Sequence, residues 1–200
     1  IGAVDCTGHG VPGPFMSVVG YNQLNELVAG KPSLSASDVL NQLDVRVRFA
    51  LKQDSEYSVT KDGMDMALCM IDTEHHQLQF AGAMRPLYLL RNGEIIEYKG
   101  TKFPIGGSQY DDKHFLHDEI DIEDGDAFYI FSDGVVDQFG GPGPKHRKYT
   151  PKRFKELLLS IKDLSMEEQG KRVEEDFYSW KGNHEQLDDV MVIGVRYRKS

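Results

Sequence analysis

Three acidic residues stand where expected β-strands end, and they are the side chains of this sequence best suited to chemistry. Asp5 and Asp133 each follow an apolar, strand-like segment, and Asp188, with Asp189 beside it, precedes another. Hard divalent cations such as Mg²⁺ and Mn²⁺ take oxygen ligands, and carboxylates suit them. We therefore predict that these aspartates converge at the rim of a sheet and hold divalent cations there.

Glycines accompany two of these aspartates. Gly8 and Gly10 follow Asp5 on either side of His9, and Gly134 follows Asp133. Glycine permits tight turns and lets the backbone approach an ion or a phosphate closely, and a helix N-terminus after a glycine-rich turn can hold an anion. We predict that these three glycines lie near a phosphate. Read singly, each aspartate could equally be an ordinary turn residue or a solvated strand flank.

The first part of the chain reads as two helices. Segment 14–28 has helical spacing. The residues expected on one apolar face are Phe15, Val18, Val19 and Asn22, extended by Leu24, Leu27 and Val28. Gly30 and Pro32 end this segment, and Ser35 or Ser37 can cap the next helix.

Strand patterns dominate the middle of the chain and helices return after it. Segment 64–71 is apolar enough for a strand buried on both faces, and Asn92-Gly93 is a two-residue hairpin signal. Ser165, with Glu168 three residues on, has the spacing of a capping box for a late helix. Strands in a block with helix pairs before and after it predict an α+β fold, with helices packed on antiparallel sheets.

Composition narrows the classes of protein. The chain has 200 residues, which suits a single domain over 1–200, and 23 basic against 32 acidic residues give a net charge of −9. This balance argues against nonspecific nucleic-acid binding, which usually shows a basic stripe. No apolar run reaches the roughly 18 residues of a membrane span, so we expect no membrane contact. Two cysteines, Cys6 and Cys69, favour a reducing, cytoplasmic compartment.

Six short segments occur in an order that resembles a known family. They are DCTGHGVPGPFMS (5–17), GMDMAL (63–68), FAGA (80–83), FPIG (103–106), FSDGVVD (131–137) and LDDV (187–190). Together they resemble the bacterial metal-dependent serine/threonine phosphatases of the sporulation stage II protein E type, a branch of the type 2C (PPM) phosphatase superfamily. The resemblance implies two packed antiparallel sheets flanked by helices, an α-β-β-α sandwich, and it runs over nearly the whole chain.

The resemblance also implies a set of metal ligands. Asp5 matches the carboxylate that bridges two Mn²⁺ or Mg²⁺ ions, with the backbone carbonyl of Cys6 as a second ligand. Asp133 and Asp188 match ligands of the second ion. Further candidates are Asp189, beside that ligand, and Asp62 or Asp65, either of which could hold a third and looser ion.

The implied reaction is hydrolysis of phosphoserine or phosphothreonine on a signalling protein. A water activated by the two cations attacks the phosphorus, so no side chain acts as nucleophile. Cys6 lacks a Cys-x5-Arg signature, and we expect its side chain in the core. His9 is the candidate acid for the leaving oxygen; the alternative is a structural histidine inside the glycine-rich turn.

One departure from the family pattern bears on activity. The family carries another metal-binding Asp on a strand upstream of Asp5, whereas this sequence begins four residues before Asp5. We therefore expect a domain that lacks its N-terminal strand or strands, with weak cation binding, and an unpaired sheet edge that could drive homodimer formation. A catalytically weak or inactive module that binds a phosphoprotein or a regulatory partner is the alternative function.

The family also implies partners. We expect the chain to be the C-terminal output domain of a larger bacterial signalling protein, with a sensor domain upstream. The implied substrate is a phosphorylated anti-sigma-factor antagonist, which would place the protein in sigma-factor regulation.

Overall fold

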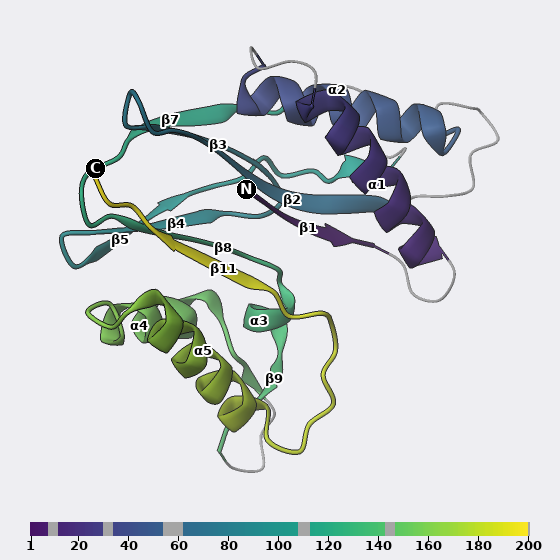
Figure 1. The fold of residues 1–200 in the computed structure, drawn as a ribbon. Helices are drawn as coiled ribbons and strands as arrows, with labels where there is room; N and C mark the ends of the chain where they lie inside the picture. Colours follow the sequence, from purple (N-terminus) through teal and green to yellow (C-terminus); the bar gives the residue numbers. More distant parts are fainter. Residues whose placement is uncertain (8–11, 30–33, 54–61, 108–112, 143–146, 200) are drawn as a thin grey trace. The chain divides into compact units, whose positions relative to one another are not determined.

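In the computed structural model of the chain, two of the candidate aspartates belong to antiparallel sheets or follow them directly (Figure 1). Asp5 lies in strand β1 (Gly2–Cys6), and Asp133 follows strand β8 (Ala127–Phe131). The structure describes residues 1–199 apart from 8–11, 30–33, 54–61, 108–112 and 143–146. The chain divides into two compact units, one of Ile1–Pro86 and Lys99–Asp121 and one of Leu87–Tyr98 and Ile122–Ser200. The predicted α+β class, with antiparallel sheets and helices, is confirmed.

The first unit is built on a sheet in the order β1-β2-β3-β7, with a short strand, β6, also paired to β2. The partners of β1 are β2 (Gly63–Asp72), β3 (Gln77–Ala83), β6 (Ile105–Gly106) and β7 (His117–Asp121). The antiparallel register of β1 and β2 places Asp5 opposite Asp65. Residues directly opposite in an antiparallel pair share one face of the sheet, so these two carboxylates lie on the same face.

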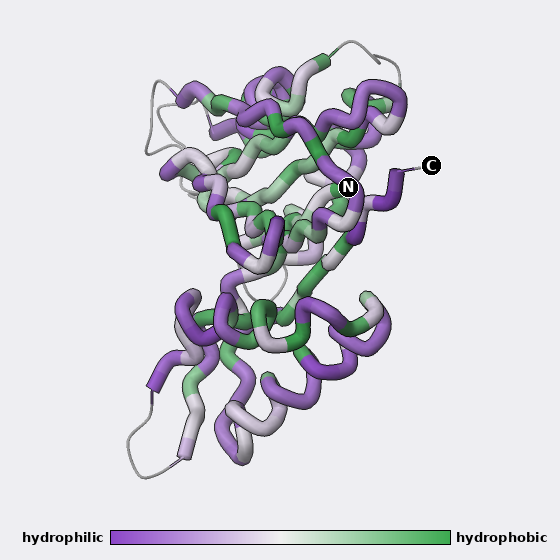
Figure 2. The backbone as a smooth tube through the Cα atoms, turned by 90° about the vertical axis from the view of Figure 1, so that its left-hand side faces the viewer, coloured by the Kyte–Doolittle hydropathy of each residue, from purple (hydrophilic) through white to green (hydrophobic). Residues whose placement is uncertain are grey.

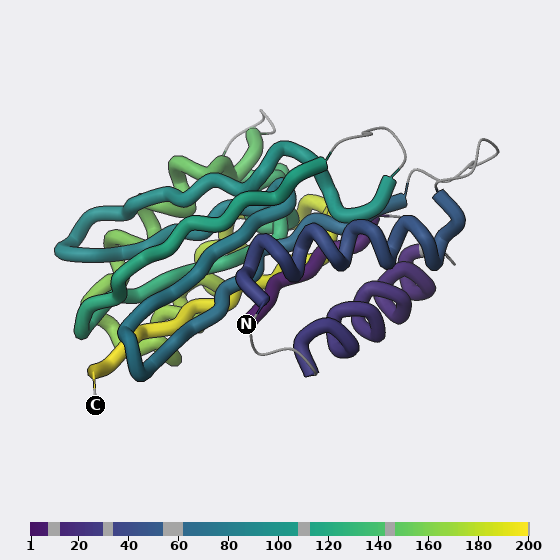
Figure 3. The backbone as a smooth tube through the Cα atoms, turned by 90° about the horizontal axis from the view of Figure 1, so that it is seen from above, coloured from purple at the N-terminus to yellow at the C-terminus, as the bar shows by residue number. Residues whose placement is uncertain are grey.

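Two helices, α1 (Pro12–Val28) and α2 (Ala36–Ala50), lie side by side and cover one face of this sheet (Figures 1 and 3). Of the two predicted caps, Ser35 is the one used. Its side chain accepts from the Asp38 backbone N–H, and the Asp38 carboxylate accepts from the Ser35 backbone N–H, which completes a capping box.

The buried face of α1 differs from the prediction. Phe15 and Val18 are 62% and 57% exposed, whereas Met16, which was not expected on this face, is almost fully buried. Leu27 is buried as expected. The helix turns another face to the sheet because Gly20 lets it approach β2: a Cβ at this position would lie 2.9 Å from the Met64 Cε atom. The expectation that Phe15 and Val18 face the core was therefore wrong.

The second unit has a four-stranded antiparallel sheet in the order β11-β8-β4-β5. Besides β8 it contains β4 (Leu87–Arg91), β5 (Glu94–Tyr98) and β11 (Val192–Arg196). The predicted hairpin joins β4 to β5, and both turn residues have positive φ, 51° at Asn92 and 80° at Gly93. The pairing of β8 with β11 sets Phe131 opposite Val192, so the end of β8 meets the beginning of β11.

Helices α4 (Pro151–Ser160) and α5 (Met166–Lys181) lie on one face of this second sheet (Figure 1). Ser165 and Glu168 form the predicted capping box of α5. Hydrophilic residues, purple in Figure 2, dominate α5, whose buried side chains include Phe177. Shorter elements that the sequence did not predict are α3 (Gly134–Asp137), β9 (Phe139–Gly140) and β10 (Arg147–Lys148).

Aromatic rings fill the core under α4. The Phe131 ring lies 4.9 Å from the ring of Tyr88 and 4.8 Å from that of Phe154, centroid to centroid. This packing fixes the end of β8, where the chain turns toward Asp133. None of the helices in the described part of the chain is long and apolar enough to span a membrane.

The buried thiol of Cys69 gives a test of the first unit. Burial raises the pKa of this thiol to about 12, so almost none of it is thiolate at neutral pH, and the thiolate is the reactive form. We expect iodoacetamide to leave Cys69 unmodified between pH 7 and pH 9 in the folded protein, and to modify it after unfolding in urea, as read by peptide mass spectrometry. Rapid labelling of folded Cys69 would contradict the described packing of β2.

Candidate metal centre

Asp133 and Asp188 come together in the second unit. A carboxylate oxygen of each lies within 4.8 Å of one on the other, which is a separation that one cation can bridge. Asp133 is half-buried and Asp188 is exposed. Two convergent carboxylates offer the oxygen donors that Mg²⁺ and Mn²⁺ prefer, so the residues present fit a hard divalent cation.

The antiparallel pairing of β8 and β11 produces this meeting. Asp133 follows β8 by two residues, and Asp188 precedes β11 by four. In an antiparallel pair the end of one strand lies beside the beginning of the other. Residues 55 positions apart in the sequence are therefore brought to the same end of the sheet.

A buried serine hydroxyl joins the two segments. The Ser132 hydroxyl donates to the Asp189 carbonyl oxygen (2.8 Å) and accepts from the Met191 N–H (2.9 Å). The Ser132 N–H in turn donates to the Met191 carbonyl oxygen (3.1 Å). The residue before Asp133 is thus tied to the residues after Asp188, and neither segment can move far alone. We call this arrangement the Ser132 bridge.

Gly134 allows these segments to approach closely. A Cβ at this position would lie 2.4 Å from the Asp189 carbonyl oxygen, a contact that real Cβ atoms essentially never make. The predicted proximity of Gly134 to a phosphate stays a prediction; the close approach that the structure shows is to the Asp189 backbone.

Two further hydrogen bonds shape the loop that carries Asp188. The Asp189 N–H donates to an Asp188 carboxylate oxygen (2.8 Å), and the Gln186 side-chain amide donates to the Asp188 carbonyl oxygen (2.9 Å). The Asp189 side chain is exposed, and its backbone serves the Ser132 bridge.

In the first unit, Asp5 lies on β1 and is half-buried. The Thr7 hydroxyl donates to the Gly63 carbonyl oxygen (2.8 Å) and accepts from the Gly63 N–H (2.7 Å). We call this arrangement the Thr7 bridge. As in the Ser132 bridge, one hydroxyl is both donor and acceptor, and here it fixes the chain two residues after the candidate ligand Asp5.

Cys6 is half-buried and packs against the hydrophobic core of the first unit. Burial raises the pKa of its thiol, and the negative charge of Asp5 adds to the rise. A raised pKa keeps the sulfur protonated and weakly nucleophilic. This agrees with the interpretation that Cys6 is not a nucleophile.

The candidates for a third ion, Asp62 and Asp65, both lie near hydrogen-bonding side chains of the first unit. Asp65 accepts from Arg85 Nε (3.0 Å) in an ion pair whose two side chains are largely buried. The Asp62 carbonyl oxygen accepts from the buried Gln53 side chain (2.6 Å). Gly8, His9 and Gly10 lie outside the described residues.

The sequence did not point to the residues that hold these segments, Ser132, Thr7 and Gln53. For Ser132 and Thr7, the sequence offered one signal: each is a hydroxyl residue within two positions of a candidate aspartate. The bonding partners of those hydroxyls lie more than 50 residues away, so only the strand register identifies them.

The chain matches the family model described as Stage II sporulation protein E (SpoIIE) over residues 1–198, and it therefore belongs to this family. It is similar to the SiaA-PP2C domain of Pseudomonas aeruginosa, with 29% identity and a TM-score of 0.85, over 98% of this chain and 74% of that one. No curated protein sequence matches it.

Two other solved structures share the fold at lower identity. The PP2C phosphatase domain of SpoIIE from Bacillus subtilis, solved with a fragment of its regulatory domain, has 17% identity and a TM-score of 0.73; the alignment covers 100% of this chain and 53% of that one. The catalytic domain of the serine/threonine phosphatase PstP, in complex with two manganese ions, has 18% identity and a TM-score of 0.63, over 96% and 85% of the two chains. The fold is thus that of the PP2C-type phosphatases.

Removing the Ser132 hydroxyl tests the bridge. Ser132→Ala leaves the Asp189 carbonyl and the Met191 N–H without this partner, so we expect the free energy of unfolding to fall by about 1–3 kcal/mol. Urea unfolding followed by circular dichroism measures the change. Ser179→Ala, on the exposed side of α5, is the matched control and should stay within about 0.5 kcal/mol of the parent. Equal stability of the two variants would refute the bridge.

Adding a methyl group at Gly134 tests the close approach. Gly134→Ala forces the Asp189 carbonyl away, and we expect a loss of about 1–3 kcal/mol in unfolding free energy. Gly170→Ala is the control, because a Cβ there meets no atom within 4 Å; it should raise stability by up to about 1 kcal/mol through better helix propensity. A Gly134→Ala protein as stable as the parent would show that the segments do not pack as described.

Proposed function

We propose that this chain is a metal-dependent protein serine/threonine phosphatase that hydrolyses phosphoserine or phosphothreonine on a signalling protein. The observation that supports this most strongly is the proximity of the Asp133 and Asp188 carboxylates at the shared end of β8 and β11. Membership of the SpoIIE family supports the reaction class.

The metal ligands that we propose are the ones that the family resemblance implies. Asp133 and Asp188 hold one divalent cation, and Asp5, with the Cys6 backbone carbonyl, contributes to a pair of Mn²⁺ or Mg²⁺ ions. The two manganese ions of the PstP structure support this choice of cofactor. We propose that the two units work together as one phosphatase domain, since the family match runs over both.

The residues of the chain have positioning roles in this reaction. When bound, such cations supply an activated water and offset the negative charge of the phosphoryl oxygens. Asp133 and Asp188 orient the cation, while the Ser132 bridge keeps their two segments together. The described residues include no thiolate nucleophile, since Cys6 and Cys69 both have raised pKa values. His9 stays a candidate for protonating the leaving oxygen.

The substrate that we propose is a phosphorylated regulator of the anti-sigma-factor antagonist type, in the cytoplasm and under the control of an upstream sensor domain. The support for this part is the family alone.

Phosphate release from a phosphoserine peptide tests the proposal. We expect release that requires Mn²⁺ and stops with EDTA, and Asp133→Asn should reduce it by more than the roughly 100-fold that losing a supporting residue can cost. Asp163→Asn, an exposed aspartate of the same unit, is the matched control and should keep full activity. Release that survives both EDTA and Asp133→Asn would refute the proposal. Mn²⁺ binding without any release would favour the non-catalytic module.

A further inference from the structure

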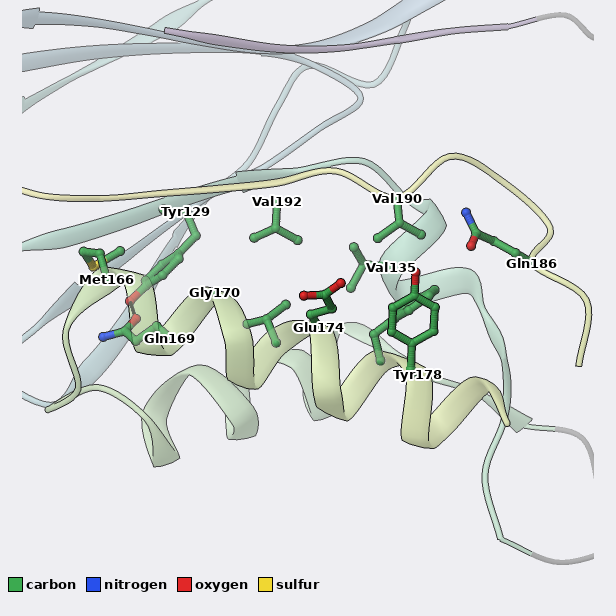
Figure 4. A pocket seen from close by; sticks show the side chains of 13 residues that line it. Tyr129, Val135, Met166, Gln169, Gly170, Glu174, Tyr178, Gln186, Val190 and Val192 are labelled. Atoms are coloured by element: carbon green, nitrogen blue, oxygen red, sulfur yellow. Dashed lines mark hydrogen bonds between the residues drawn. The ribbon is translucent and has the colours of Figure 1, made fainter. Parts of the chain in front are cut away.

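A cavity of about 490 Å³ lies in the second unit between α5 and strand β11 (Figure 4). Its size falls within the roughly 300–1,000 Å³ that small-molecule pockets occupy. Val190 and Val192 line the sheet side, and Val173 and Phe177 line the helix side. An apolar group of about the size of one aromatic ring, bound in the cavity, would therefore contact apolar side chains on both the sheet side and the helix side.

Gly170 also lines the cavity, and neither its backbone conformation nor a close contact within the described residues requires glycine at this position. It lies inside α5, where glycine costs about 1 kcal/mol relative to alanine, and its φ is not positive. A Cβ there would meet nothing within 4 Å. The missing side chain thus enlarges the cavity at the expense of the helix, as expected if an external group packs over this turn.

One end of the cavity has its polar groups satisfied. The Tyr129 hydroxyl donates to the Gln169 Oε1 atom (2.7 Å), and Gln169 Nε2 donates to the carbonyl oxygens of Lys162 and Leu164. Gln169 is buried, and both donors of its amide are in use. This end therefore offers a ligand an apolar surface and no spare amide donor.

The opposite part of the cavity carries one carboxylate, that of the exposed Glu174. The Glu174 carboxylate points from α5 toward the sheet, and the Tyr178 hydroxyl points the same way (Figure 4). Other acidic residues of α5 are engaged, Glu175 with Arg172 (3.1 Å) and Asp176 with Arg153 (2.7 Å). Within the described residues, Glu174 has no such partner. A carboxylate beside an apolar cavity favours a cation.

We propose that this cavity binds a small organic cation: an ammonium or amidinium group carried on an aromatic or branched aliphatic body. The cation contacts the Glu174 carboxylate, and the body packs over Gly170 between Val192 of β11 and the apolar face of α5.

The cavity also contacts the segments that carry the candidate metal ligands. Gln186 lines it and holds the Asp188 carbonyl, while Val135 and Val190 follow Gly134 and Asp189 directly in the chain. Occupancy of the cavity therefore biases the position of Asp188. This regulatory link rests on the proposed function, whereas the binding site does not.

Titration with 2-phenylethylamine, followed by ¹H–¹⁵N NMR of the chain without metal, tests the site. We expect saturable shifts at the amides of Gly170 and Val192, with affinity at least about fivefold above that of the neutral 2-phenylethanol. Phenylacetate should not bind. Equal binding of all three compounds, or no binding of the amine at millimolar concentration, would overturn the proposal.

Two variants locate the ligand. Glu174→Gln should remove the preference for the amine and leave 2-phenylethanol binding unchanged, whereas Glu175→Gln, one residue further along the helix, should change neither. Gly170→Leu should block all binding while the NMR spectrum stays that of a folded protein. Unchanged amine affinity in Glu174→Gln would place the ligand elsewhere.

The regulatory link has its own measurement. Saturating Mn²⁺ should change the affinity for 2-phenylethylamine, and the amine should change the affinity for Mn²⁺ by the same factor. Amine binding that Mn²⁺ does not affect would overturn the link and leave the binding site standing. A chain that releases no phosphate still tests the cavity, because the NMR readout needs neither metal nor substrate.

Discussion

The antiparallel pairing of β8 with β11 is the constraint on which the candidate metal centre depends. It sets Phe131 opposite Val192 and so brings the turn after β8 beside the loop before β11. The Ser132 bridge fixes that meeting with one buried hydroxyl, and Gly134 leaves room for the Asp189 carbonyl. Two carboxylates that repel each other are thereby held within reach of one cation, so the folding energy of the sheet is what keeps the ligands together.

In the first unit, a hydroxyl group fixes the backbone near Asp5 in the same way. The Thr7 bridge ties the chain beyond Asp5 to Gly63, at the start of the strand that pairs with β1. A hydroxyl that donates and accepts adds two hydrogen bonds to backbone groups at a strand end. In both units the candidate ligand thus lies on backbone that is fixed by hydrogen bonds, although the aspartates themselves are not fully buried. Rigid backbone beneath a partly exposed carboxylate suits a site that a cation and a substrate must reach.

Sequence reasoning recovered the parts of this arrangement that local pattern determines. The helix cap at Ser35, one of two candidates, the capping box at Ser165 and the Asn92-Gly93 hairpin depend on neighbours within a few residues, and all three are present. The buried face of α1 was wrong because the approach allowed by Gly20 depends on Met64, far away in the sequence. For the same reason the roles of Ser132 and Thr7 could not be predicted, since their partners are set by strand register. Asp133 and Asp188 were singled out because each flanks an apolar strand, and the structure brings these two carboxylates together. Their role as metal ligands, like that of Asp5, stays a prediction.

A crystal structure of the chain grown with MnCl₂, with anomalous scattering data at the manganese edge, tests the central claim most directly. The account predicts an anomalous peak in contact with carboxylate oxygens of both Asp133 and Asp188, with the Ser132 bridge intact beneath it. Manganese found only at other carboxylates, or Asp133 and Asp188 turned away from each other, would contradict it.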